Sequence, residues 1–309
     1  MRYVPPTRLE CFVALVCTVL FLLLTGLFVG LRTEHFFLVV ALDLLFFATS
    51  YTRKLVVALL PFVVFVVSYD YMRIWPNYQV NPIDVAGLYG AEKSIFGVTV
   101  DGVRMTLSEF FHGHHWVVLD FLSGIFYLCW VPVPVLFGLA LFVKGRRELA
   151  LRFALVFLLV NLIGFTGYYI HPAAPPWYVM EYGFDPVFGT PGNVAGLGRF
   201  DDLVGSPIFA SMYGRNSNVF AALPSLHSAY MPVVFTYAVI GRCKRWFIGL
   251  SGLIMVGIWF TAIYTGHHYT IDVLLGIICA FVGILLFEQV LLHIPAFRRF
   301  LSRYTAYIS

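Results

Sequence analysis

Residues 11–31 read CFVALVCTVLFLLLTGLFVGL, a run of 21 residues without a charged side chain. A helix rises about 1.5 Å per residue, so about 20 apolar residues cross the roughly 30 Å hydrocarbon core of a bilayer. A secretory signal peptide has a shorter apolar run that ends at a small-residue cleavage site, and neither property is found here. The stretch therefore predicts a retained membrane-spanning helix.

Comparable apolar runs recur along the rest of the chain. Hydrophobic residues make up 60% of the 309 residues and charged residues only 12%, and the mean hydropathy is +0.86. This composition is far from that of soluble proteins. We expect an all-α polytopic membrane protein in which residues 1–309 form a single transmembrane domain of about eight helices. The predicted spans are 11–31, 35–51, 55–71, 117–143, 151–170, 225–241, 246–266 and 271–293.

The basic residues predict the orientation of this bundle. With eight spans, 14 of the 20 Lys and Arg residues fall on the side of the two termini and six on the other side. Basic residues beside membrane spans mark the cytoplasmic face. We therefore expect both termini in the cytoplasm and the connections 72–116 and 171–224 in the periplasm or a lumen. The net charge of +4 is explained by this pattern and gives no reason to expect a nucleic-acid partner.

The two long outer connections differ in composition. Residues 72–116 mix apolar and polar side chains, as expected of an interfacial helix plus a loop on the bilayer surface. Residues 171–224 are rich in Gly and Pro, which predicts an ordered irregular loop rather than a helix. Loops of this length often carry function.

Polar residues open the predicted span at Pro224, where the sequence reads PSLHS. Proline suits the first turn of a helix, and the free N–H groups and positive dipole end there favour a phosphate. Ser225 offers a further hydroxyl donor, and His227, one turn into the helix, would face the same ligand. The alternative is an ordinary helix start with an interfacial histidine.

A second polar cluster, HHYTID over residues 267–272, joins the last two predicted spans on the same outer face. His268 and Asp272 are four residues apart, which places them on one side of a helix. A carboxylate bonded to one ring nitrogen leaves the other nitrogen as a directed nucleophile or base. The alternative is a pair that stabilises a helix end, but an ionisable residue in a span is costly, and this favours function.

Four segments in order resemble one family, the inositol phosphorylceramide synthases within the type 2 phosphatidic acid phosphatase superfamily. The similar segments are residues 171–178 (HPAAPPWY), 196–201 (GLGRFD), 222–228 (ALPSLHS) and 265–272 (TGHHYTID). The resemblance covers about residues 165–285 and assigns residues 151–293 to a catalytic core. Residues 1–150, the N-terminal helices and the interfacial segment, match only as a hydrophobic pattern.

The resemblance implies specific roles. His268 is the nucleophile that forms a phosphohistidine, Asp272 orients it, and His227 protonates the leaving group and then activates the acceptor. Superfamily phosphatases carry an Arg six residues before the nucleophile, where this chain has Ala262. The substrate- or phosphate-binding candidates are Ser225, Arg199, Arg215, His171, Tyr269 and His267.

The expected function is transfer of phosphoinositol from phosphatidylinositol to ceramide or another lipid alcohol, with release of diacylglycerol. The alternatives are a lipid phosphate phosphatase and a non-enzymatic lipid transporter, although transporters usually show paired repeats that are not evident here. Neither a metal nor an organic cofactor is expected, since His112, His114 and His115 have no spaced partner ligands. The sequence identifies no protein partner.

Overall fold

The computed structural model describes residues 4–214 and 218–309. The helices are α1 (Arg8–Phe28), α2 (Thr33–Ala48), α3 (Ser50–Tyr71), α4 (Ala86–Phe96), α5 (Leu107–Gly113), α6 (Val117–Leu128), α7 (Pro132–Val143), α8 (Arg147–Ile170), α9 (Pro176–Tyr182), α10 (Gly198–Val204), α11 (Ile208–Tyr213), α12 (Leu226–Ile240), α13 (Arg245–Tyr264), α14 (Thr270–Leu285) and α15 (Pro295–Ile308). One antiparallel hairpin, β1 (Val98–Val100) and β2 (Val103–Met105), pairs Val98 with Met105.

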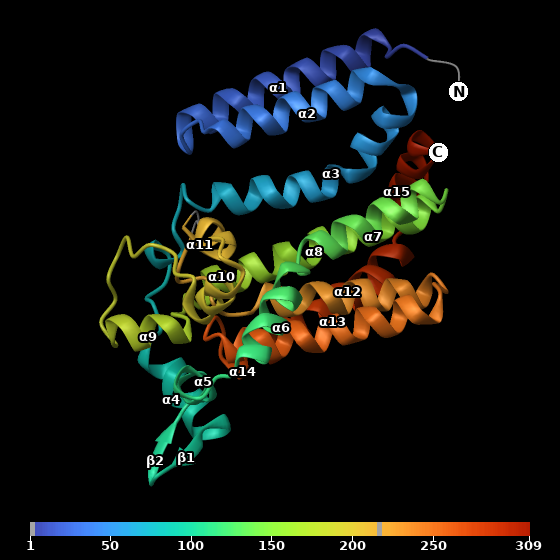
Figure 1. Ribbon diagram of the computed structural model, residues 1–309. Coiled ribbons are helices and arrows are strands. Elements are labelled where there is room, and N and C mark those ends of the chain that lie inside the picture. The colour runs from blue at the N-terminus through green and yellow to red at the C-terminus, as the bar shows by residue number, and fades with distance from the viewer. Residues whose placement is uncertain (1–3, 215–217) are drawn as a thin grey trace.

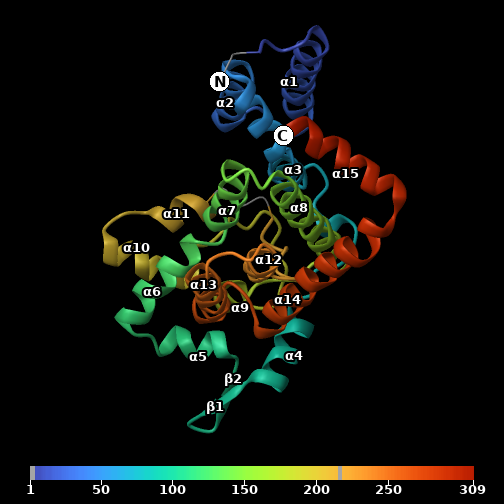
Figure 2. The ribbon, with the colours of Figure 1, turned by 90° about the vertical axis from the view of Figure 1, so that its right-hand side faces the viewer.

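The long helices form a bundle around α12. An end-on view places α12 at the centre, with α8, α13 and α14 packed around it (Figure 2). The short elements α4, α5, α9, α10 and α11 gather at one end of the bundle, and both termini lie at the other end (Figure 1). This separation gives the molecule two distinct ends.

The fold confirms an all-α polytopic membrane protein. Among the described residues, five helices are long and apolar enough to span a bilayer, and a sixth span results if α6 and α7, bent by 42°, cross as one. The remaining two predicted spans correspond to α2 and α12, which are helices of only 16 and 15 residues. The count of eight spans therefore stays a prediction.

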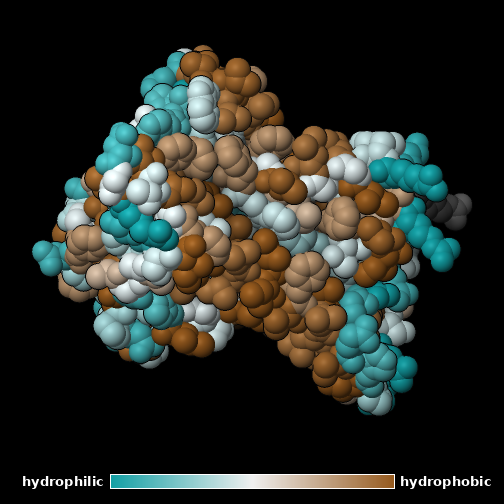
Figure 3. Space-filling model, turned by 90° about the horizontal axis from the view of Figure 1, so that it is seen from below, coloured by the Kyte–Doolittle hydropathy of each residue, from teal (hydrophilic) through white to brown (hydrophobic). Residues whose placement is uncertain are grey.

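The surface is consistent with a bilayer environment. A hydrophobic belt separates two hydrophilic ends of the molecule (Figure 3). Helix α1 illustrates the belt, because Leu15, Leu23 and Leu27 are all exposed along it. Apolar side chains in such numbers outside the core are explained by contact with lipid rather than water.

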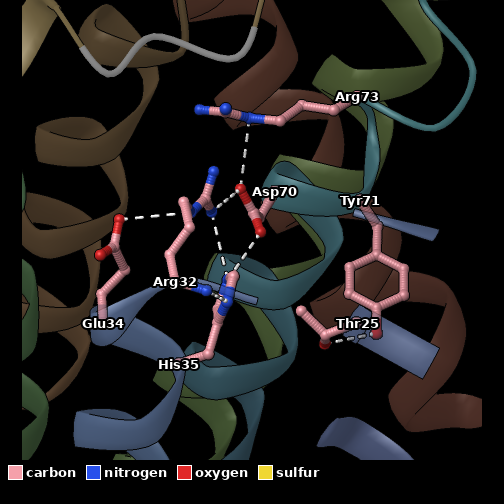
Figure 4. Close-up of polar contacts among 7 residues, drawn as sticks. All are labelled: Thr25, Arg32, Glu34, His35, Asp70, Tyr71 and Arg73. Carbon is pink, nitrogen blue, oxygen red and sulfur yellow. Dashed lines mark hydrogen bonds and ion pairs between the residues drawn. The ribbon is translucent and has the colours of Figure 1, made fainter. Parts of the chain in front are cut away.

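A polar cluster attaches the α1–α2 hairpin to α3 (Figure 4). The carboxylate of Asp70 accepts a bond of 2.5 Å from Arg32, lies 3.1 Å from the His35 ring, and forms an ion pair of 3.3 Å with Arg73. The hydroxyls of Thr25 and Tyr71 are 2.9 Å apart beside it. The hairpin stands apart from the bundle (Figure 2), and these contacts hold it against the C-terminal end of α3.

The expectation of an irregular loop over residues 171–224 is wrong, because this segment contains α9, α10 and α11. Its prolines and glycines mark helix ends. Pro176 is the first residue of α9, while Gly183 and Gly205 follow α9 and α10 with φ angles of +76° and +66°. Proline at a helix start and glycine after a helix end are the favoured positions of these residues.

Glycines bring the central helices into close contact. A β-carbon built on Gly276 of α14 would lie 2.0 Å from the carbonyl oxygen of Ser225, at the start of α12. A β-carbon on Gly164 of α8 would lie 2.4 Å from Leu226. Small residues at helix contacts are the usual means by which membrane helices approach closely. Here they bring the start of α12 into close contact with α14 and α8.

We predict that Gly276→Ala destabilises the protein, because the added methyl group meets backbone that cannot rotate away. The expected loss is about 1–3 kcal/mol, seen as a lower melting temperature of the purified protein in detergent. Gly249→Ala is the matched control, since Gly249 is exposed on α13 and its added β-carbon meets nothing within 4 Å. Equal melting temperatures for the two variants would contradict the proposed contact.

Candidate active site

The first polar cluster forms the start of α12. Ser225 is the N-cap, and its hydroxyl accepts a bond of 3.4 Å from the Ser228 N–H. The expectation that Pro224 lies in the first helical turn is wrong: this residue precedes the cap, after a cis peptide bond. Ser225 is fully buried, and its hydroxyl also accepts a hydrogen bond of 3.1 Å from the Ser228 hydroxyl. His227 is the second residue of the helix.

The second cluster forms the turn between α13 and α14. His268 precedes α14 rather than lying within it, because the helix begins at Thr270. The expected pair nevertheless forms: Nδ1 of His268 lies 3.5 Å from Oδ2 of Asp272. The same oxygen accepts a bond of 2.9 Å from the Tyr269 N–H. The N–H groups of His267 and His268 both donate to the carbonyl of Ala262, which fixes the turn.

The two clusters meet in a row of three side chains. Nδ1 of His227 lies 3.0 Å from Nε2 of His268, whose other ring nitrogen faces Asp272. Asp272 is completely buried and His268 is 5% exposed. When the carboxylate accepts a hydrogen bond from the Nδ1–H group of His268, the free electron pair of that ring is on Nε2. The sequence prediction that these three residues share one site is thus consistent with the geometry.

His227 and His268 lie on the wall of a cavity of about 230 Å³. Most of this wall is aromatic or apolar, and the described residues that form it include no Lys, Arg, Asp or Glu. They are Phe65, Tyr69, Trp130, Phe165, Tyr168, Pro175, Trp177, Asn193, Met212, Tyr213, Asn218, Val219, Ala221, Ala222, Leu226, His227, Tyr230, His267 and His268. A cavity of this composition suits an amphipathic ligand with a polar end at the histidines.

His267 contributes an uncharged ring to this wall. Its Nδ1 lies 2.9 Å from the Thr265 hydroxyl. Burial, and after it the neighbouring His268, lowers the pKa of His267 to about 3, so the ring is neutral at pH 7. Its Nε2 has no hydrogen-bond partner within the described chain, and the ring centroids of His267 and Tyr213 are 4.5 Å apart. These atoms are available to a ligand.

The other candidate residues that the structure describes lie outside the cavity wall. Arg199 donates to Asp120 at 2.6 Å, although its Nη2 is buried with no partner in the described structure. His171 is exposed and pairs with Asp84 at 3.0 Å. Tyr269 is fully buried behind the turn. Arg215 lies outside the described residues.

Three aromatic residues at the site were not identified from the sequence: Trp130 and Tyr213 line the cavity, and Tyr127 packs behind His227. Tyr127 stacks on His227 with ring centroids 5.0 Å apart, and Trp130 contacts the same ring edge-on at 4.5 Å. Tyr213 reaches the cavity from α11. Tyr127 and Trp130 belong to an apolar run in which a ring facing lipid and a ring facing a site look alike. The one sequence signal is the helical spacing of Asp120, Ser123 and Tyr127, which are all buried on one face of α6. This spacing indicates which rings face the protein interior.

The described residues contain no group of three or more His, Cys, Asp or Glu side chains placed to hold a metal ion. His115 pairs with Asp120 at 3.0 Å, and His114 stacks on Phe110. The expectation that the chain needs neither metal nor cofactor remains an expectation.

The chain is similar to curated lipid synthases along most of its length. It is 61% identical to the phosphoinositol dihydroceramide synthase of Bacteroides thetaiotaomicron, over 98% of this chain and 99% of that protein. It is 28% identical to the inositol phosphorylceramide synthase catalytic subunit of Saccharomyces cerevisiae, over 72% of this chain and 54% of that protein. The Candida albicans inositol phosphorylceramide synthase is 29% identical over 63% of this chain and 40% of that protein.

A family model of the PAP2 superfamily matches residues 102–286. No solved structure matches the chain. The matched segment contains His227, His268 and Asp272 together with the helices that position them. The chain therefore belongs to the PAP2 superfamily and, within it, to the inositol phosphorylceramide synthase family.

Proposed function

We propose that this protein transfers phosphoinositol from phosphatidylinositol to a ceramide-type lipid alcohol and releases diacylglycerol. The observation that carries the proposal is the row Asp272, His268 and His227 at the wall of an aromatic cavity inside a membrane bundle. The name of the Bacteroides thetaiotaomicron relative favours dihydroceramide as the acceptor.

In the first step, Nε2 of His268 attacks the phosphorus of the donor lipid. The bond between phosphorus and the glycerol oxygen breaks, and diacylglycerol leaves with a proton from His227. Asp272 holds the Nδ1 proton of His268 and stabilises the positive charge that develops on the ring. The two rings face each other at 3.0 Å, so the donor phosphate has to separate them as it enters.

In the second step, the acceptor hydroxyl gives its proton to His227 and its oxygen attacks the phosphohistidine. The bond between phosphorus and Nε2 breaks, which restores the free enzyme. A covalent intermediate lets the two lipids use one cavity in turn. The apolar wall favours a lipid alcohol over water as the acceptor.

The charge of the cavity supports a phosphodiester substrate. A phosphomonoester carries up to two negative charges near pH 7, whereas a phosphodiester carries one. The described part of the wall has no Lys or Arg, and His267 is neutral. The position at which superfamily phosphatases carry an Arg is Ala262, a fully buried residue. A site with so few cations is better suited to the transferase reaction than to a phosphatase.

The membrane arrangement is part of the proposal. We place both termini in the cytoplasm and the cavity near the outer face, in the periplasm or a lumen, with eight crossings that include the short helices α2 and α12. Both termini lie at the end opposite α9, α10 and α11, in agreement with an even number of crossings (Figure 1). Residues 1–309 then act as one catalytic domain.

We predict that quenched enzyme given phosphatidylinositol carries inositol still attached to phosphate, on His268. Added ceramide should discharge this intermediate faster than water does. Mass spectrometry of the digested protein checks both. A bare phosphate on His268, with free phosphate released from phosphatidic acid, would instead indicate a phosphatase.

The variants His268→Ala and Asp272→Asn should lose nearly all turnover while remaining monodisperse, because one lacks the nucleophile and the other its orientation. His293→Ala, at the opposite end of the bundle, is the control. Wild-type turnover in purified His268→Ala protein would exclude the assignment, and the absence of any lipid product from the wild type would favour a transporter.

The Tyr213 hydroxyl is a candidate for contact with the inositol ring. It makes no hydrogen bond of normal geometry within the described chain, and its nearest polar neighbour is the Tyr127 hydroxyl. Burial raises the pKa of Tyr213 well above its usual value, so the hydroxyl stays protonated. We predict that Tyr213→Phe lowers kcat/KM for phosphatidylinositol about tenfold, the effect of one lost hydrogen bond. Tyr182→Phe, at an exposed ring on α9, should leave kcat/KM unchanged. An unaltered kcat/KM for Tyr213→Phe would exclude the proposed contact with inositol.

Cysteine labelling tests the orientation. In a variant whose five native cysteines are replaced by alanine, a cysteine at the exposed residue Asp202 should react with an impermeant reagent in intact cells. A cysteine at exposed Lys244 should react only after the cells are opened. The reverse pattern would invert the proposed topology.

A further inference from the structure

Glu92 is a buried carboxylate that the sequence motifs do not include. It lies on α4, in the interfacial segment and before the part of the chain that matches the superfamily. Its side chain is 1% exposed, and the bonds that its two oxygens accept within the described residues come from backbone N–H groups. Oε1 accepts a bond of 2.9 Å from the Thr270 N–H, and Oε2 accepts one of 3.1 Å from the Ile271 N–H. A buried carboxylate is costly unless hydrogen bonds compensate for the water that it loses.

These two N–H groups belong to the first turn of α14. The next residue is Asp272, which bonds back to the Tyr269 N–H. Glu92 and Asp272 therefore share the positive end of one helix, where the free N–H groups stabilise negative charge. The two carboxylates lie close enough to interact electrostatically.

Helix α4 is itself anchored to the site. The Asp84 N–H donates to the Pro172 carbonyl at 2.7 Å, and the Ala174 N–H donates to the Asp84 carbonyl at 3.0 Å. Leu88 packs against Tyr269 and Ala173 in a small buried cluster. An end-on view shows α4 directly beside the start of α14 (Figure 2). The position of Glu92 is thus fixed by contacts other than its own bonds to α14.

We propose that Glu92 is a positioning residue for the transfer reaction: it holds the first turn of α14 so that Asp272 orients His268, and it adds a second negative charge that stabilises the imidazolium as the phosphorus–nitrogen bond forms. This inference rests on the proposed function. It adds a residue that acts through Asp272 and does not touch the substrate.

Glu92→Gln tests the inference, because it keeps the shape of the side chain, removes its charge and turns an N–H donor toward the helix. We expect kcat to fall about tenfold or more while KM for phosphatidylinositol changes less than twofold, since the cavity wall is intact. Glu92→Asp retains the charge and should recover part of kcat. Glu109→Gln is the control, because Glu109 caps α5 of the same segment through the Thr106 N–H and should leave kcat unchanged.

The pH profile separates positioning from general support of the fold. The titratable groups that face His268 are Asp272, His227 and His267. Loss of the Glu92 charge destabilises the protonated His268 ring, so the acid limb of kcat/KM in Glu92→Gln should move to lower pH. A purely structural role would lower the melting temperature without moving this limb.

The result that overturns the inference is a Glu92→Gln protein with the kcat and the acid limb of the wild type. A wild type that makes no lipid product would instead overturn the proposed function, so the two failures are distinguishable. If Glu92→Gln does not give monodisperse protein, Glu92→Asp carries the test: the inference requires reduced kcat at unchanged KM, and wild-type kcat contradicts it.

Discussion

One backbone hydrogen bond joins the two halves of the site. The N–H of Ser225, just before α12, donates to the carbonyl of Asp272 in the first turn of α14 at 3.0 Å. Lipid offers no substitute for a missing backbone partner, so such a bond between helix ends is strongly retained. It can form only because Gly276 allows the Ser225 carbonyl to approach. The 3.0 Å separation of His227 and His268 follows from that approach.

The sequence predicts those site residues whose important neighbours lie within a few positions along the chain. His227, His268 and Asp272 are polar groups at the edges of apolar runs, and the cost of placing them there makes them candidates for a site. Where the environment is created by distant segments, sequence reasoning has no signal. Arg199 was expected at the phosphate but donates to Asp120, 79 residues away. Helices α9, α10 and α11 were missed because prolines and glycines at the ends of short helices have the same composition as a loop.

The cavity is built by more of the chain than the superfamily segment alone. Phe65 and Tyr69 of α3 contribute to its wall, although residues 102–286 are the part that the family model matches. The Asp70 cluster at the end of α3 links that wall to the α1–α2 hairpin. The N-terminal helices are therefore connected through α3 to the wall of the cavity.

The contact between Glu92 and Thr270 joins residues 178 positions apart, and this separation has a consequence for biosynthesis. A ribosome adds roughly 5–20 residues per second, so α4 emerges roughly 9–36 s before its partner helix exists. During that interval the carboxylate has no helix end to cap and remains hydrated at the membrane surface. Insertion of α13 and α14 then supplies its N–H partners together with His268 and Asp272. The pairing of His268 with Asp272 and the burial of Glu92 are in this way a single late event in translation.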